Sequence, residues 1–170
     1  MLAQALGTSA LGLLGTSGVA KLIDPDPTTG AMSAARLPSS TLLSRLLGVL
    51  EVVLAVSGLA VGGRLPLAAA TLLYLAFALF TFGARVKRLP LQSCGCFGRD
   101  DTPPTAIHVA YNVVAMLGLG YLSIAGLAPI EWNSPLIALG IYLVFAGIGV
   151  YASYLLLATL PRLHTHIRSA

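Results

Sequence analysis

The chain has 170 residues, of which 56% are hydrophobic and 9% are charged, with a formal net charge of +4. Soluble domains have roughly 45–50% apolar and about 25% charged residues, so this chain has too little polar surface to cover a domain in water. A disordered segment is excluded too, because disorder requires low hydrophobicity and high charge. The basic residues are scattered among apolar runs and form no basic face, which argues against nucleic-acid binding. The composition therefore predicts an integral membrane protein whose first partner is the lipid bilayer.

Apolar segments long enough to cross a bilayer recur along the chain. A spanning helix needs about 20 mostly apolar residues, within a range of roughly 17–25. The segments are rich in Leu and Ala and do not alternate with polar residues, so they predict an all-α protein. The first segment has its first basic residue at its end, which favours a retained helix over a signal peptide. The predicted spans are residues 2–22, 42–61, 65–84, 107–127 and 135–160, within a single transmembrane domain of residues 1–170.

The connections between these spans differ in length. Residues 62–64 form a tight hairpin and residues 128–134 a short connection, whereas residues 23–41 and 85–106 form two longer loops. The prolines at the start of the first long loop are expected to end the first helix. The second long loop contains both cysteines. Alternation of five helices across the bilayer places both long loops and the C-terminus on one face.

The basic residues are distributed unevenly between the two faces. Of the ten Lys and Arg residues, Arg64 falls on the face of the short connections and the other nine fall on the face of the long loops. By the positive-inside rule, we expect the long loops and the C-terminus in the cytoplasm and the N-terminus outside, in a multi-pass protein of the plasma membrane. The nine residues are Lys21, Arg36, Arg45, Arg85, Lys87, Arg88, Arg99, Arg162 and Arg168.

The leading candidate for chemistry is the string Ser93-Cys94-Gly95-Cys96-Phe97-Gly98 in the second long loop. Two thiols one residue apart can close a small ring, and Gly95 supplies the backbone freedom that this ring requires. A tight ring is strained and readily reduced, which suits an exchanging disulfide. Nearby basic residues favour the thiolate form of Cys94 and Cys96. These two residues are the predicted catalytic pair of a thiol-disulfide oxidoreductase activity that uses no bound cofactor, and the alternative is a pair of inert loop thiols.

The same cysteines leave a metal site open as an alternative. Structural zinc takes about four protein ligands, of which Cys94 and Cys96 supply two and His108 a third, while His164 and His166 fall on the same predicted face. The spacing is not that of a zinc ribbon or finger. A cuprous ion held by two thiolates is a variant of this interpretation.

Glu51 is the only acidic residue within a predicted span. Intramembrane carboxylates are costly and usually face the interior of a helix bundle with a partner. Glu51 is therefore predicted to act as a proton relay or as an anchor for a basic group from the loops, or to fix helix packing through a salt bridge or a hydrogen bond, for example with Asn112. Asn112 is itself expected to hydrogen-bond across helices. The glycines at 12, 15 and 18, and at 58 and 62, predict surfaces for close helix approach.

Four stretches together resemble the MauE family, within the wider DoxX-like group of small membrane proteins. The family signature between the third and fourth helices matches Ser93–Gly98, and Asn112 falls where the family has an asparagine. Tyr111 departs from the pattern, because an arginine is expected before that asparagine. The resemblance covers about residues 8–128, and its other two stretches are Ser17–Pro25 and Arg36-Leu37-Pro38 with Leu50-Glu51.

The resemblance implies a four-helix transmembrane bundle, to which this chain adds a fifth C-terminal helix. It implies a role in maturing methylamine dehydrogenase with a thioredoxin-like redox partner. Cys94 and Cys96 would be the redox pair, with Glu51, Lys21 and Asn112 as supporting groups. That enzyme matures outside the cytoplasm, whereas the charge asymmetry places the cysteines inside. The alternative functions are a non-catalytic scaffold or assembly subunit, in a membrane complex or homo-oligomer, and a proton-linked transporter using Glu51.

Overall fold

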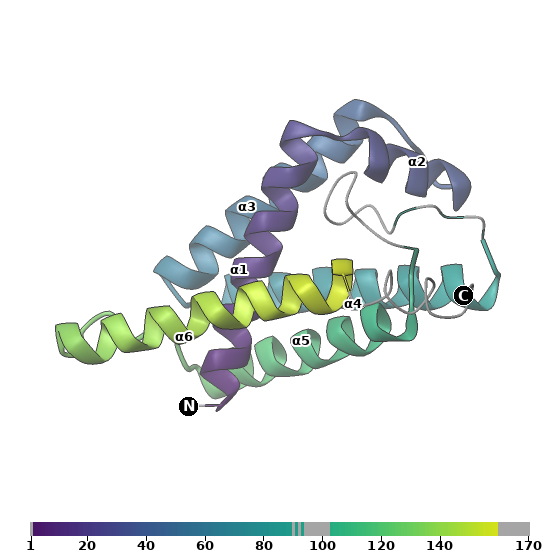
Figure 1. The fold of residues 1–170 in the computed structure, drawn as a ribbon. Helices are drawn as coiled ribbons and strands as arrows, with labels where there is room; N and C mark the ends of the chain where they lie inside the picture. The colour runs from purple at the N-terminus through teal and green to yellow at the C-terminus, as the bar shows by residue number, and fades with distance from the viewer. Residues whose placement is uncertain (1, 90, 92, 94–102, 160–170) are drawn as a thin grey trace.

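The structure, a computed structural model, describes residues 2–89, 91, 93 and 103–159 and is helical with no strand in this part of the chain (Figure 1). Five of its helices are long and apolar enough to cross a membrane. The prediction of an all-α integral membrane protein is confirmed. The helices are α1 (Leu2–Ile23), α2 (Asp26–Ala34), α3 (Thr41–Ala60), α4 (Arg64–Val86), α5 (Ala106–Ala125) and α6 (Leu136–Tyr154), followed by the short π-helix η2 (Leu155–Thr159).

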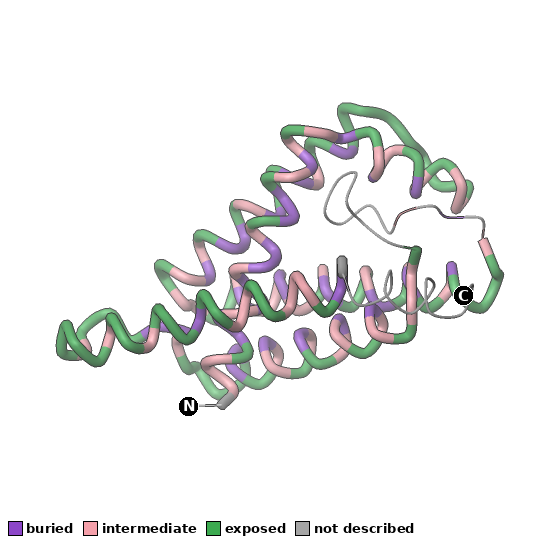
Figure 2. The backbone as a smooth tube through the Cα atoms, viewed as in Figure 1, coloured by how far each residue is buried: buried purple, intermediate pink, exposed green. Residues whose placement is uncertain are grey.

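Four of the long helices form two antiparallel pairs. Helix α1 packs along α3, and α4 packs along α5 (Figure 1). The two pairs meet at the end where a hairpin joins α3 to α4, and they diverge toward the end that carries α2 (Figure 1). Helix α6 packs mainly against α1 and is exposed along most of its length (Figure 2). The predicted four-helix bundle with an added fifth helix is therefore confirmed.

The core lies where the helix pairs face each other. Its buried side chains come from α1, α3, α4 and α5. The outward faces of the helices are exposed (Figure 2) and include many Leu, Val and Ile residues. Exposed apolar side chains of this kind suit contact with lipid acyl chains, which are as apolar as leucine. The largest fully buried apolar side chains of this core are Leu11, Leu14, Leu67, Leu119 and Leu122.

Helix α2 lies within the segment that the sequence analysis assigned to a loop. That assignment was wrong for Asp26–Ala34. Pro25 occupies the N-cap and Pro27 lies in the first turn, where a missing backbone N–H has no cost and a fixed φ favours the helix. The prolines therefore end α1, as predicted, and also begin α2.

The tripeptide Arg-Leu-Pro follows both α2 and α4 in the sequence, and both helices end alike. Arg36 (φ 58°) and Arg88 (φ 49°) adopt the left-handed conformation. The following residues, Leu37 and Leu89, donate backbone hydrogen bonds of 2.9 and 3.0 Å to carbonyls five residues earlier. This is the Schellman arrangement, in which an apolar residue after the left-handed position turns back onto the helix. Leu89 thereby packs against the cluster of Ala31, Ala84 and Leu91, whereas Leu37 lines a cavity and stays 45% exposed.

Candidate functional site

The site is organised by a close crossing of α1 and α3. A Cβ atom added to Gly18 would lie 2.6 Å from the carbonyl oxygen of Gly48, and one added to Gly48 would lie 2.8 Å from the carbonyl oxygen of Gly18. Glycine at both positions therefore lets the two backbones touch. The close approach predicted for Gly18 is present, whereas Gly48 was not anticipated as its counterpart. Three residues beyond each glycine lie Lys21 and Glu51.

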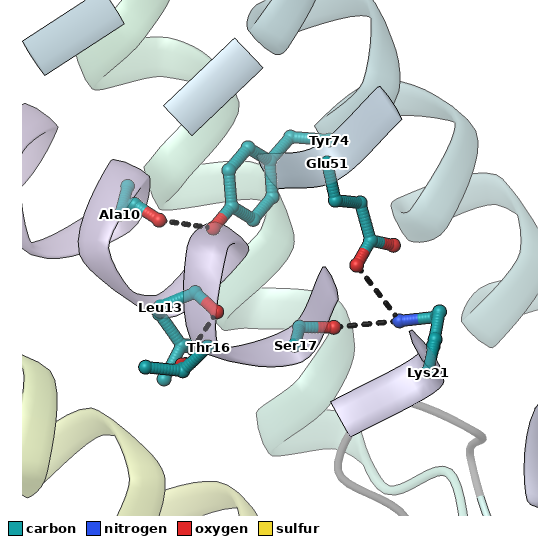
Figure 3. Close-up of polar contacts among 7 residues, drawn as sticks. All are labelled: Ala10, Leu13, Thr16, Ser17, Lys21, Glu51 and Tyr74. Carbon is teal, nitrogen blue, oxygen red and sulfur yellow. Dashed lines mark hydrogen bonds and ion pairs between the residues drawn. The ribbon is translucent and has the colours of Figure 1, made fainter. Parts of the chain in front are cut away.

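Lys21 and Glu51 form a buried ion pair across this crossing. The Lys21 ammonium donates hydrogen bonds to Glu51 Oε2 over 3.0 Å and to Ser17 Oγ over 2.6 Å (Figure 3). The two side chains are only 3% and 0% exposed. The ammonium also lies 5.9 Å from the centre of the Phe77 ring on α4, a distance at which the ring face attracts a cation. The pair therefore connects α1, α3 and α4 at one point.

The ion pair agrees with one of the interpretations of Glu51, a salt bridge that fixes helix packing, and the partner is Lys21 of α1. The suggested bond between Glu51 and Asn112 was wrong. Lys21, which the charge count places on the face of the long loops, lies in the last turn of α1, and its side chain is buried within the bundle. The second carboxylate oxygen, Oε1, is buried without a hydrogen-bond partner among the described residues.

Asn112 of α5 lines a small cavity together with Ser17, the residue that binds Lys21. The Asn112 side chain is 8% exposed and borders this cavity of about 30 Å³, which His108 also lines. The hydrogen bonds observed in the described part of the chain include none to its amide, and the expected bond across helices stays a prediction. Its neighbour Tyr111, at the position where the resemblance leads one to expect arginine, packs edge-on against Tyr74 with ring centres 6.5 Å apart.

His108 closes the start of α5 directly after the cysteine loop. The backbone N–H of Thr105 donates a 3.2 Å hydrogen bond to His108 Nδ1, and the Thr105 hydroxyl lies 2.9 Å from the same atom. The histidine is buried and acts as a cap. No group of three or more His, Cys, Asp or Glu side chains suited to a metal occurs among the residues described. Cys94, Gly95, Cys96, His164 and His166 lie outside the described residues, and the metal site stays a prediction.

The chain that leads into the cysteine loop is fastened to the bundle. Leu91 is buried and packs with Ala31 of α2 and Ala84 of α4, and Leu89 packs against the same cluster. Leu91 precedes Cys94 by three residues. Packing at Leu91 and the cap at Thr105 therefore hold the loop at both of its ends.

A cavity of about 250 Å³ lies between α1, α2, α3 and α4, at the diverging end of the bundle. Its wall is apolar apart from Lys21 and two threonines. Ala31 belongs both to this wall and to the cluster that holds Leu91. The residues that line it are Lys21, Thr28, Ala31, Met32, Leu37, Leu47, Leu73, Ala76, Phe77, Phe80 and Thr81.

Sequence reasoning missed several members of this site. Ser17 was quoted only as part of a motif, yet it bridges the ion pair and the small cavity. Gly48 carries the same signal as Gly18, since each precedes a charged residue by three positions. Phe77 carries no local signal, because its role depends on α4 lying beside Lys21.

The family model for the Methylamine utilisation protein MauE matches residues 1–128. The chain belongs to this family. The matched region extends from α1 through α5, and it includes the Lys21–Glu51 pair and the cysteine loop, whereas α6 lies beyond it. Searches of curated proteins and of solved structures found no match. Membership of the MauE family connects the chain with methylamine utilisation.

Proposed function

We propose that this MauE-family protein is a membrane thiol-redox accessory protein that serves the maturation of methylamine dehydrogenase or a similar target. In this proposal Cys94 and Cys96 exchange a disulfide with a thioredoxin-like partner. Family membership supports the connection with methylamine utilisation. The proposal assigns the chemistry to the Cys-Gly-Cys string and the support of the loop to the helix bundle.

The observation that carries the proposal is the anchoring of the chain on both sides of the cysteine pair. Leu91 is 7% exposed and packs between α2 and α4, and Thr105 and His108 cap α5 at the other end. Reactive residues are commonly placed on loops that a rigid scaffold positions. A loop with fixed ends limits the orientations in which a partner disulfide meets the thiols, which favours exchange with one docked protein.

The Lys21–Glu51 pair contributes indirectly to the anchoring of the cysteine loop. It ties α1 to α3 one turn from the end of α1, where the chain passes into α2. Helix α2 in turn supplies Ala31 to the cluster that holds Leu91. Glu51 and Lys21 are therefore positioning residues in the proposal, and Ser17 is a third.

The proposed exchange needs no reactant besides the two proteins, because each disulfide bond that forms replaces one that breaks. The thiolate of one cysteine attacks a sulfur of the partner disulfide, forming a mixed disulfide and releasing a partner thiolate. The thiolate of the other cysteine then attacks the mixed disulfide. The products are a Cys94–Cys96 disulfide and a reduced partner, and the reverse sequence reduces this chain and oxidises the partner.

Trapping of the mixed disulfide tests this function. Cys96→Ser and Cys94→Ser single variants, purified in detergent, are first converted to the mixed disulfide of their remaining cysteine with thionitrobenzoate. They are then mixed with a reduced thioredoxin-like protein that lacks its own resolving cysteine, whose thiolate displaces thionitrobenzoate and leaves a disulfide between the two proteins. At least one single variant is expected to form a covalent complex that a reductant dissolves, and the double variant provides the background. Absence of the complex with both single variants, in protein that remains folded by circular dichroism, would contradict the proposal.

The sidedness of the cysteines is part of the proposal, because the positive-inside distribution favours the cytoplasm. Nine basic residues were assigned to the face of the long loops, and one of them, Lys21, is buried. The other eight still outnumber Arg64, the single basic residue on the opposite face. A membrane-impermeant maleimide applied to sealed right-side-out and inverted vesicles reports the accessible side. Labelling from the cytoplasmic side is expected, and labelling from the outside alone reverses the topology.

A further inference from the structure

The cavity between α1, α2, α3 and α4 combines an apolar wall with one charged side chain, Lys21, and two buried threonines. Its volume of about 250 Å³ lies just below the roughly 300–1,000 Å³ of common small-molecule sites, so it suits a single substituted ring. Phe77 and Phe80 supply aromatic surface, and three leucines, one methionine and two alanines complete the apolar wall.

Lys21 is the charged member of this wall and has donor capacity to spare. An ammonium group carries three N–H donors, and its hydrogen bonds to Ser17 and Glu51 use two of them. The third can serve a ligand oxygen. Because Glu51 already neutralises the ammonium charge, an anionic ligand would add an unpaired charge to a buried site, which is costly. The site therefore favours a neutral carbonyl oxygen over a carboxylate.

The wall of the cavity includes an exposed residue of α4, one of the helices long and apolar enough to cross a membrane. Ala76 and Leu37 belong to its wall and are exposed, Leu37 to 45%. The helices α3 and α4 diverge at this end of the bundle (Figure 1). A ligand that carries a long apolar tail can therefore place its ring in the cavity and leave the tail among lipid chains.

The chemistry of the proposed thiol pair narrows the class of ligand further. Formation of a Cys94–Cys96 disulfide from two thiols releases two electrons and two protons. A quinone accepts two electrons and two protons, and its two carbonyl oxygens become the hydroxyls of a hydroquinone. The wall of the cavity is joined to the cysteine loop through Ala31, which packs with Leu91 three residues before Cys94.

We propose that this cavity binds a lipid-soluble quinone, with a ring carbonyl accepting a hydrogen bond from Lys21, and that the quinone reoxidises the Cys94–Cys96 dithiol. The inference rests on the proposed thiol-redox function. It assigns Lys21 a binding contact in addition to its structural one. It also gives the direction of electron flow, from the partner through the cysteine pair to the quinone.

Photolabelling tests the binding step on the full chain in phosphatidylcholine nanodiscs. The probe is an azido-benzoquinone with a decyl tail, and labelled peptides are mapped by mass spectrometry. Label is expected on the α4 segment 73–81, which contributes five wall residues, namely Leu73, Ala76, Phe77, Phe80 and Thr81. Ala76→Trp fills the cavity from its exposed rim and should lower labelling at least tenfold. The matched control Leu72→Trp, on the same helix but outside the wall and 65% exposed, should label like the wild type.

Competition identifies the chemistry that the cavity recognises. Unlabelled decyl-benzoquinone is expected to suppress the labelling, and decanoate at the same concentration is expected to leave it unchanged. Equal suppression by decanoate would show a general site for acyl chains and overturn the proposal. Labelling that is insensitive to Ala76→Trp would overturn it as well.

Electron transfer is measured on the reduced protein. Addition of decyl-benzoquinone should convert the two thiols to a disulfide with one equivalent of hydroquinone formed, more slowly in Ala76→Trp than in Leu72→Trp. If the quinone probe labels the cavity but decyl-benzoquinone does not oxidise the two thiols, the proposal that the quinone is the oxidant is rejected. If mixed-disulfide trapping succeeds and the cavity takes no label, the quinone proposal fails and the thiol-exchange function stands. If trapping fails while quinone still oxidises the thiols, the thioredoxin-like partner is rejected and the quinone site stands.

Discussion

Replacement of one member of the Lys21–Glu51 pair should destabilise the bundle far more than replacement of both. At the observed separation of 3.0 Å, the Coulomb attraction is about 5.5 kcal/mol for an effective dielectric constant of about 20. Removal of one partner from a buried pair leaves an uncompensated charge and typically costs about 3–5 kcal/mol. We therefore expect a loss of about 3–5 kcal/mol for Lys21→Met. The double variant Lys21→Met/Glu51→Leu should lie much closer to the wild type, because it leaves no unpaired charge.

The assay is reversible unfolding in mixed micelles, by titration with sodium dodecyl sulfate and far-ultraviolet circular dichroism. Lys87→Met is the matched control, because Lys87 is exposed at the end of α4, and it should change the unfolding free energy by less than about 0.5 kcal/mol. Hydrogen bonds between membrane helices contribute about 0.6 kcal/mol on average. A cost below about 1 kcal/mol for Lys21→Met, or a double variant whose loss equals the sum of the two single losses, would refute the argument.

Three further changes test the elements that build the site. Gly48→Ala forces α1 and α3 apart, because its Cβ would lie 2.8 Å from the Gly18 carbonyl oxygen. It should lower the free energy of unfolding by about 1–3 kcal/mol in the same titration. The control Gly83→Ala, in open space on α4, should leave the free energy of unfolding unchanged or raise it. Arg36 has φ 58°, so Arg36→Val should be less stable than Arg36→Gly by about 1 kcal/mol or more, and equal stabilities would argue against the left-handed helix end. Leu91→Ala should slow disulfide exchange with the thioredoxin-like partner while both thiols remain titratable, and an unchanged rate would show that this anchor does not position the loop.

Much of the architecture follows from local properties of the sequence. The five long helices were predictable because each apolar run is itself the length of a membrane span, and no distant residue is needed to recognise it. The Cys-Gly-Cys string and the family resemblance are local in the same sense. Helix α2 was missed because Pro25 and Pro27 are compatible both with the end of one helix and with the first turn of the next.

The partners within the site depended on which helix faces meet. The sequence identifies Glu51 as a residue that needs a partner. Lys21 lies 30 positions away in the sequence and was counted among the basic residues on the face of the long loops. The Gly18–Gly48 contact brings the two charges together, because it lets the backbones of α1 and α3 touch one turn before them. Phe77 joins them through the placement of α4.

The sequence by itself determined that this protein is a helical membrane protein with a thiol pair in a long loop and one carboxylate within the bilayer. The tertiary structure decided that the carboxylate is neutralised by Lys21, that α2 covers the start of the loop, and that a cavity opens beside the pair. The physical reason is that hydrophobic length and motif spacing are properties of consecutive residues. An ion pair and a cavity arise only where separate helices approach, and that approach is set by packing along their whole contact.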